Sequence, residues 1–279
     1  HLFLGLTKLV IRAAGGVQWR QKEFDSRRIS VRNIMLFVCL MVLYLTPVNA
    51  CDVSLFSLVA GNSPNSAFAE KLTSLVSLGK AVANNSQNAT TLPEQLQKLM
   101  TGWIEFSNAY LVNPPEWAKN DPAWKAKFDE LADLIGSIRK NLSSQQPDQP
   151  KAHYEIQKFA RRLTRLYDGL EMDELARLLL DVSIHIDQVW DAWWEKDRKR
   201  LLETTEKFSA VCQVLSGKLD EATAKQAQDI VYRAEELHKM AAKEDVFAKK
   251  SFEFMLNMTE NDFARFNDAR KEKTADNKK

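Results

Sequence analysis

Residues 171–194 read EMDELARLLLDVSIHIDQVWDAWW, and this stretch decides the fold class. Apolar side chains recur along it in steps of four, three, four, three and four residues, which is the spacing of one face of an amphipathic helix. That face consists of Leu175, Leu179, Val182, Ile186, Val189 and Trp193. No Gly or Pro occurs from Glu171 to Ser216, and one helix of this length would be about 69 Å long. We therefore expect a break within the most charged stretch, residues 195–200.

The same helical spacing extends outward in both directions from this stretch. Upstream, residues 156–170 repeat apolar side chains at three and four positions, with Gly169 as a suitable C-cap. Two further helix starts are indicated by Leu92-Pro93 and by Asp121-Pro122, because proline is tolerated in a first turn. Downstream, helices are expected at about 220–243 and 246–271. The sequence predicts an all-α protein of about eight amphipathic helices.

These helices divide into two groups of four at Gly169. We predict two packed antiparallel four-helix bundles, over residues 66–170 and 171–272, with one elongated helical stack as the alternative. Residues 51–65 are expected to be a tether, since they include the turn residues Gly61-Asn62-Ser63-Pro64-Asn65, and 273–279 a disordered tail. Gly and Pro together number only 17 of 279 residues, which argues against a turn-rich all-β fold.

The net charge of +2 is unevenly distributed along the chain. Residues 1–50 carry seven Lys or Arg and two Asp or Glu, so the remaining 229 residues carry 32 and 35, a net charge of −3. The basic balance therefore belongs to the N-terminal segment, and nucleic acid is not expected as a partner.

An apolar run of eleven residues, 35–45, is too short to cross a hydrocarbon core of about 30 Å as a helix. Arg27, Arg28 and Arg32 precede it, and Pro47 follows it. A basic flank, a short apolar segment and small residues at the exit are typical of a secretory signal. We expect residues 1–50 to be a leader and signal peptide, and one hypothesis places the translation start at Val31, which leaves 1–30 untranslated.

The residues at the exit, Val48-Asn49-Ala50-Cys51, resemble the lipobox of bacterial lipoproteins, whose cysteine becomes the acylated first residue. This resemblance implies a lipid anchor at Cys51 and therefore a membrane as partner. In enterobacterial lipoproteins an aspartate after the cysteine, here Asp52, is associated with retention at the inner membrane. The expected location is the periplasmic face of that membrane, with the outer membrane or the soluble periplasm as alternatives. A disulfide between Cys51 and Cys212 is the competing interpretation of this cysteine.

His185 is the most informative single candidate for a binding site. It lies at the edge of the apolar face, and Asp181 precedes it by one helical turn, close enough to accept a proton from the imidazole. A carboxylate that orients a histidine suits a metal ligand or a general base. A half-buried histidine in ordinary packing needs the same partner, so packing is the alternative.

Glu235 and His238 form a Glu-x-x-His pair, whose spacing places both side chains on one helix face. Ferritin-like di-iron proteins need this motif twice, and no second copy occurs in the sequence. There is also no Cys-x-x-Cys-His motif for covalent haem attachment. No cofactor is predicted, and a metal or a non-covalent haem centred on His185, with His238, is the alternative.

Aromatic and charged side chains define two further candidate surfaces. Trp190 and Trp194 share a helix face beside the apolar stripe, and they either pack between the bundles or form a contact surface for an apolar ligand or partner. A basic face is expected on the helix before Gly169, while residues 171–197 are strongly acidic. Such faces are usually solvated, and the alternative is that they dock on each other or on a partner. The basic residues are Lys158, Arg161, Arg162 and Arg165.

No nucleophile elbow, P-loop, dinucleotide fingerprint or zinc-protease motif is present in the sequence, so a catalytic function is not predicted. The function expected from the sequence is that of an exported, lipid-anchored helical protein with a protein partner. It would act as a binding or scaffolding component at the membrane, and a periplasmic metal or haem binder is the second hypothesis.

Overall fold

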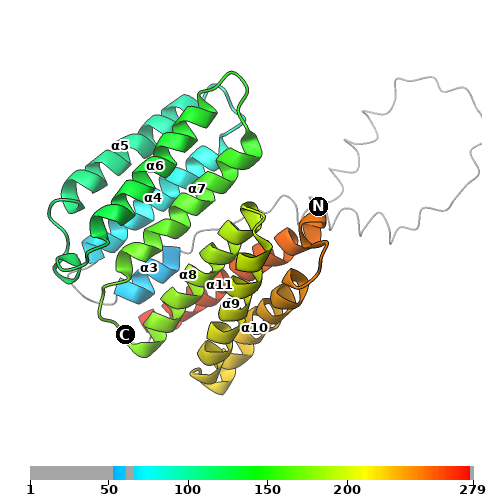
Figure 1. The fold of residues 1–279 in the computed structure, drawn as a ribbon. Helices are drawn as coiled ribbons and strands as arrows, with labels where there is room; N and C mark the ends of the chain where they lie inside the picture. Colours follow the sequence, from blue (N-terminus) through cyan, green and yellow to red (C-terminus); the bar gives the residue numbers. More distant parts are fainter. Residues whose placement is uncertain (1–52, 61–65, 277–279) are drawn as a thin grey trace, which may run out of the picture. The chain divides into compact units, whose positions relative to one another are not determined.

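The computed structural model describes residues 53–60 and 66–276. All regular secondary structure within these residues is helical (Figure 1), which confirms the expected all-α class. The expected leader, the lipobox with Cys51 and residues 277–279 of the expected tail lie outside the described residues. In the described part of the chain, no helix combines the length and the apolarity needed to cross a membrane.

The first four long helices form a closed group. They are α4 (Ser66–Asn84), α5 (Leu92–Tyr110), α6 (Trp124–Leu142) and α7 (Gln149–Leu163). Each helix contacts the next, and α7 closes the group by packing against α4. Short 3₁₀ turns precede α6 and follow α7, at η1 (Glu116–Ala118) and η2 (Thr164–Tyr167). Aromatic rings fill much of the interior, for example Phe106 stacked on Phe128 with 5.6 Å between centroids.

The last four helices form a second closed group. They are α8 (Glu174–Trp194), α9 (Arg198–Gly217), α10 (Glu221–Ala241) and α11 (Lys250–Asp276), with the 3₁₀ turn η3 (Val246–Ala248) before α11. Successive helices contact one another, and α11 returns to α8. The helices α8, α9 and α10 each begin at an aspartate whose side chain accepts a hydrogen bond from the backbone N–H three residues later. These caps are Asp173, Asp197 and Asp220.

The break expected within residues 195–200 is confirmed, because α8 ends at Trp194 and α9 begins at Arg198. Lys196 takes a positive φ of 55° in this turn, which reverses the chain direction over three residues. The last helix extends further than expected, to Asp276, and therefore includes part of the segment expected to be a tail.

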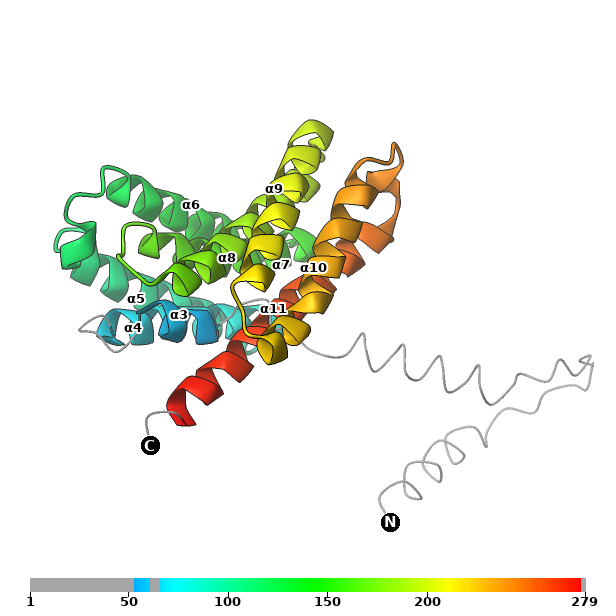
Figure 2. The same cartoon turned by 90° about the horizontal axis from the view of Figure 1, so that it is seen from below.

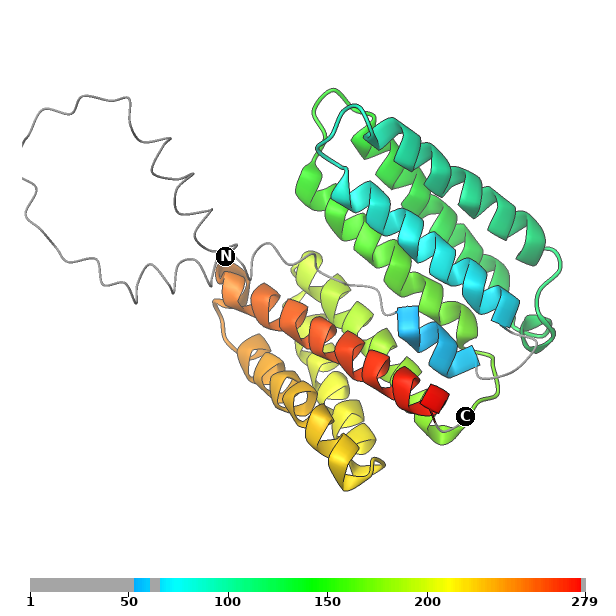
Figure 3. The same cartoon turned by 180° about the vertical axis from the view of Figure 1, so that it is seen from behind.

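The segment expected to be a tether contains a helix, α3 (Val53–Ala60). Its side chains Leu55 and Phe56 are 0% and 2% exposed, and Val59 is buried beside them. The helix contacts α4 of the first group and both α8 and α11 of the second. Figure 3 shows α3 in blue beside α4 and α11. This helix is not predicted from the sequence, because its apolar pattern spans only two turns before the turn residues at 61–65 begin.

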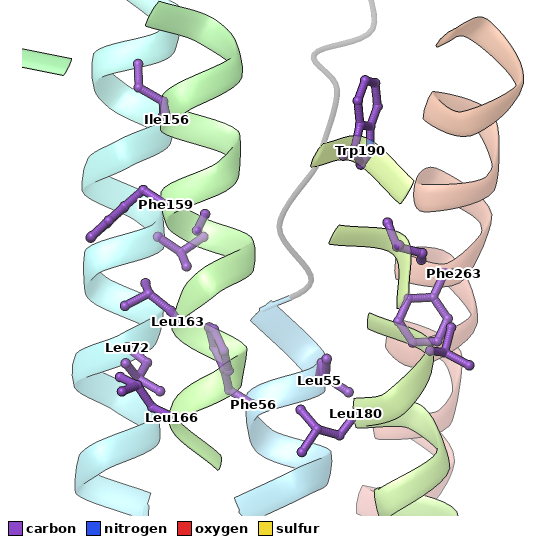
Figure 4. Close-up of a cluster of buried hydrophobic side chains, with 14 of the residues drawn as sticks. Leu55, Phe56, Leu72, Ile156, Phe159, Leu163, Leu166, Leu180, Trp190 and Phe263 are labelled. Carbon is purple, nitrogen blue, oxygen red and sulfur yellow. The ribbon is translucent and has the colours of Figure 1, made fainter. Parts of the chain in front are cut away.

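The two groups meet through α7 and α8, which lie side by side at the centre of the described chain (Figures 1 and 2). Residues 168–173 connect them. Buried apolar side chains continue across this junction as one core. Figure 4 shows how α3 contributes, with Phe56 directed towards α7 and Leu55 towards Leu180 of α8.

Candidate functional site

The junction of α7 and α8 contains charged side chains that are withdrawn from water. Arg161 and Arg162 are 3% and 5% exposed, and Asp187 and Asp191 are 0% and 1% exposed. Charged residues are rarely buried to this extent unless they are paired. We name this group the ionic cluster, and its members are Lys158, Arg161, Arg162 and Arg165 of α7 and η2, Asp187 and Asp191 of α8, Glu130 of α6, and Glu260 of α11.

Asp187 lies at the centre of the ionic cluster and accepts from three guanidinium groups. Arg162 donates from Nη1 to Oδ2 of Asp187. Arg165 donates from Nη2 to the same oxygen at 3.0 Å, and Arg161 donates from Nε to Oδ1 at 3.4 Å. Two adjacent arginines of α7 and a third from the following turn, η2, thus converge on one carboxylate of α8.

Asp191, one helical turn after Asp187, accepts from a different set of donors. The Tyr154 hydroxyl donates to Oδ1 at 2.7 Å, and Lys158 Nζ lies 3.0 Å from the same oxygen. Arg162 donates from Nη2 to Oδ2, and Arg200 of α9 approaches that oxygen to 3.7 Å. Arg162 therefore joins both aspartates through the two nitrogens of one planar group, a geometry that lysine could not reproduce.

Glu260 and Glu130 connect the ionic cluster to α11 and α6. Trp190 donates from Nε1 to Oε2 of Glu260 at 2.9 Å, and Arg161 Nη1 lies 3.5 Å from the other oxygen. The Arg161 guanidinium also lies over the Trp190 ring, 5.3 Å from its centroid. On the opposite side, Arg162 Nε lies 2.6 Å from Oε1 of Glu130. The cluster therefore links helices of both groups.

The electrostatics of the ionic cluster reflect competition between burial and pairing. Burial raises the pKa of Asp187 and that of Glu260 above their ordinary values, although neighbouring arginines oppose the change. Burial also acts on Asp191, but Arg162, Tyr154 and Lys158 outweigh it and lower the pKa of that carboxyl. The four cations and four carboxylates of the cluster balance when all are ionised, and Arg200 adds a fifth cation 3.7 Å from Asp191.

This arrangement can hold two helical groups in one orientation, because each carboxylate is directed at fixed donors. Buried ion pairs gain attraction but lose hydration, so such a network need not add net stability, although loss of one partner from it is costly. All four carboxylates are engaged with cations of this chain. The chemistry of the cluster is therefore that of a structural joint between α7 and α8.

The predicted pair Asp181 and His185 is not joined by a hydrogen bond. His185 Nδ1 lies 3.0 Å from Oε1 of Gln188, while Asp181 pairs with Arg177 at 3.1 Å. His185 is half-buried, and this burial lowers its pKa, although the Gln188 contact and the Asp181 charge act in the opposite direction. The histidine is thus satisfied by a neighbour one turn later rather than one turn earlier.

The second predicted pair, Glu235 and His238, lies on α10 and is engaged with α9. His238 Nδ1 lies 3.2 Å from Thr205 Oγ1, and Glu235 accepts from Gln213 at 3.0 Å. Among the described residues, no group of three or more His, Cys, Asp or Glu side chains is arranged to hold a metal ion.

The two tryptophans of the predicted aromatic surface have different environments. Trp190 is 4% exposed and packs into the ionic cluster, so it belongs to the interior between the groups. Trp194 is 40% exposed, and one face of its ring stacks on Tyr154 with centroids 4.2 Å apart and planes 9° from parallel. Of these two tryptophans, Trp194 is therefore the one that offers ring surface to a partner.

Cys212, the predicted alternative partner of Cys51, carries a free thiol inside the second group. It is 1% exposed on α9, and burial raises the pKa of its thiol. Cys51 itself lies outside the described residues.

The sequence indicated half of the ionic cluster and missed the rest. The sequence predicts the basic face of α7 and favours a solvated one, which is wrong for the buried Arg161 and Arg162. The contacts of Asp187 and Asp191 show the alternative, docking on the acidic segment. Tyr154, Glu130 and Glu260 were not singled out, because they come from other turns and helices. The available signal was the four-residue spacing of Asp187 and Asp191 on the apolar side of α8, where unpaired carboxylates would be costly.

Comparisons with protein-family models, with curated proteins and with solved structures find no match for this chain.

Proposed function

We propose that this chain is an exported, lipid-anchored helical protein that acts as a binding or scaffolding component at the periplasmic face of the bacterial inner membrane. The anchor would be Cys51, in the lipobox-like sequence Val48-Asn49-Ala50-Cys51. The role is non-enzymatic in this proposal, since the carboxylates of the ionic cluster are all paired with cations of the chain itself.

The observation that carries this proposal is the position of α3. This helix begins two residues after Cys51 and is buried through Leu55 and Phe56. It contacts helices of both groups, namely α4, α8 and α11. A chain anchored at Cys51 would therefore be held close to the junction of the two groups. This arrangement suits a scaffold, because it leaves the outer faces of both groups for partners.

A partner surface on this scaffold is supported by Trp194. An exposed tryptophan braced by a second aromatic ring is a common element of protein interfaces. Glu195, the residue after Trp194, pairs with Arg200 of α9 at 2.5 Å. Capture of a partner from detergent-solubilised membranes should therefore weaken in a Trp194→Ala variant and persist in an Ile104→Ala variant, since Ile104 is an exposed apolar residue elsewhere, on α5.

The anchor is tested by mass spectrometry and fractionation of protein made in a bacterial host from the complete sequence. We expect a mature chain that begins at a diacylated or triacylated Cys51 and sediments with membranes. A Cys51→Ser variant should lose both properties, and a Cys212→Ser variant, which alters the buried thiol, should retain them. An unmodified chain that begins upstream of Cys51 and remains in the soluble fraction would contradict the proposal.

A further inference from the structure

The junction between the two helical groups has two chemically different ends. At one end the chain itself crosses, through residues 168–173, and α3 packs Leu55 and Phe56 against both groups (Figure 4). The ionic cluster begins beside this connection in sequence, at Arg165 of η2, and extends to the other end, where Tyr154, Lys158 and Arg162 of α7 meet the C-terminal half of α8. We refer to these as the apolar end and the ionic end.

The two ends differ in the free energy needed to separate the two helical groups there. Opening the apolar end would expose hydrocarbon to water, at about 25 cal/mol for each Å². It is also restrained by the six-residue connection and by the bond from Ser54 Oγ of α3 to Asp268 of α11. Opening the ionic end would unstack the Tyr154 ring from the half-exposed Trp194 ring, but it would also return charged groups to water, which recovers much of the hydration that they lost on burial. The ionic end is therefore the part of the junction that can open at the smaller net cost.

The contacts at the ionic end also fit only one register of α8 against α7. Arg162 reaches both Asp187 and Asp191, so a shift of α8 by one turn would remove one of its two partners. Glu260 of α11 and Glu130 of α6 approach from opposite sides and fix the sideways position of the arginines. Such a set of contacts is either made together or lost together.

We propose that the junction is a hinge with a clasp. The apolar end, with α3 and residues 168–173, is the pivot, and the ionic cluster is the clasp that opens to change the angle between the two groups. This conformational device goes beyond the proposed function, since it does not depend on export or on lipidation of Cys51. Its consequence is that the scaffold has a closed and an open form.

The test measures distances between the groups at both ends of the junction by pulsed electron paramagnetic resonance. Spin labels at Ser144 and Lys199, both exposed, report on the clasp end. Labels at Lys119 and Lys218, also exposed, report on the pivot end. The full chain is used with Cys39 and Cys51 replaced by serine, and the buried Cys212 is retained. The labelled positions are then combined with variants of the clasp.

The double variant Asp187→Asn with Asp191→Asn should open the clasp. We expect the population of long Ser144–Lys199 distances to rise about tenfold or more, with little change between Lys119 and Lys218. The matched control is Asp262→Asn, which removes a half-buried ion pair with Arg233 inside the second group and should leave both distances unchanged. Unchanged clasp distances in the folded double variant, or equal lengthening at both ends, would overturn the proposal.

If the double variant does not fold, a milder single variant tests the same proposal. Lys158→Gln removes a contact of Asp191 at the edge of the ionic cluster, where the lysine side chain is 17% exposed. We expect a several-fold rise in long clasp-end distances, again without change at the pivot end. A distribution identical to that of Asp262→Asn would overturn the proposal.

Discussion

Arg162 donates to Asp187 through one terminal nitrogen and to Asp191 through the other, and so joins two carboxylates that are one turn apart on α8. All three side chains are almost fully buried. Loss of a single partner from a buried ionic network leaves uncompensated charge, which is more damaging than the absence of the whole network. The contribution of Arg162 is therefore best measured by removing its charge alone.

Arg162→Met should lower the free energy of unfolding by about 3–5 kcal/mol. The substitution keeps a long apolar side chain but leaves Asp187 and Asp191 with fewer cations. The matched control is Arg265→Met, since Arg265 pairs with Asp262 at a side chain that is 76% exposed and should contribute less than about 1 kcal/mol. Urea denaturation followed by circular dichroism measures both values. Equal losses in the two variants would contradict the assignment of Arg162 to a buried joint.

Trp190→Phe should destabilise the protein, whereas Trp194→Phe should not. Phenylalanine cannot donate to Glu260, so the first variant removes a hydrogen bond from a buried carboxylate and should lower the free energy of unfolding by about 1–3 kcal/mol. The second variant keeps the stacking on Tyr154 at an exposed position, and a change within about 0.5 kcal/mol is expected. The same denaturation measurement compares them, and a larger loss for Trp194 would exclude this division of roles.

The fold class followed from the sequence because local signals repeat along the whole chain. The break after Trp194 could be predicted because charge and the absence of apolar spacing coincide there. The helix α3 could not, since eight residues give too few turns for a periodic pattern and its burial comes from helices far along the chain. The partners of the site residues are equally non-local. Asp181 lies one turn before His185, but its carboxylate pairs with Arg177, which lies one turn before Asp181.

The contribution of His185 and His153 to the free energy of unfolding should decrease as the pH falls below about 6.5, the ordinary pKa of histidine, whereas the raised pKa values of Asp187 and Glu260 act in the opposite direction. Burial lowers the pKa of His185, and burial together with the charge of Arg161 lowers that of His153. The unfolded chain therefore binds protons more readily than the folded one, so the stability is fully present above pH 6.5 and is lost towards the lowered pKa values. Denaturation at a series of pH values measures this slope.

His185→Gln should make that decrease shallower, and a second substitution, His153→Gln, should reduce it further. Each glutamine removes one group that takes up a proton on unfolding. The difference between each variant and the wild type should therefore shrink or change sign as the pH is lowered. A slope that is identical in the wild type and in the double variant would show that neither histidine is responsible for it.

Leu55→Ala tests whether α3 is a structural part of the body or a tether. The side chain is fully buried against α8, so its truncation should lower the free energy of unfolding by about 2–5 kcal/mol. Leu58→Ala, in the same helix but only partly buried, is the matched control and should have a smaller effect. A tether would contribute nothing to folding. A Leu55→Ala variant that is as stable as the wild type in urea denaturation would therefore show that α3 is not part of the pivot. Faster amide exchange in α3, with little change in α5, would locate the loss at the junction.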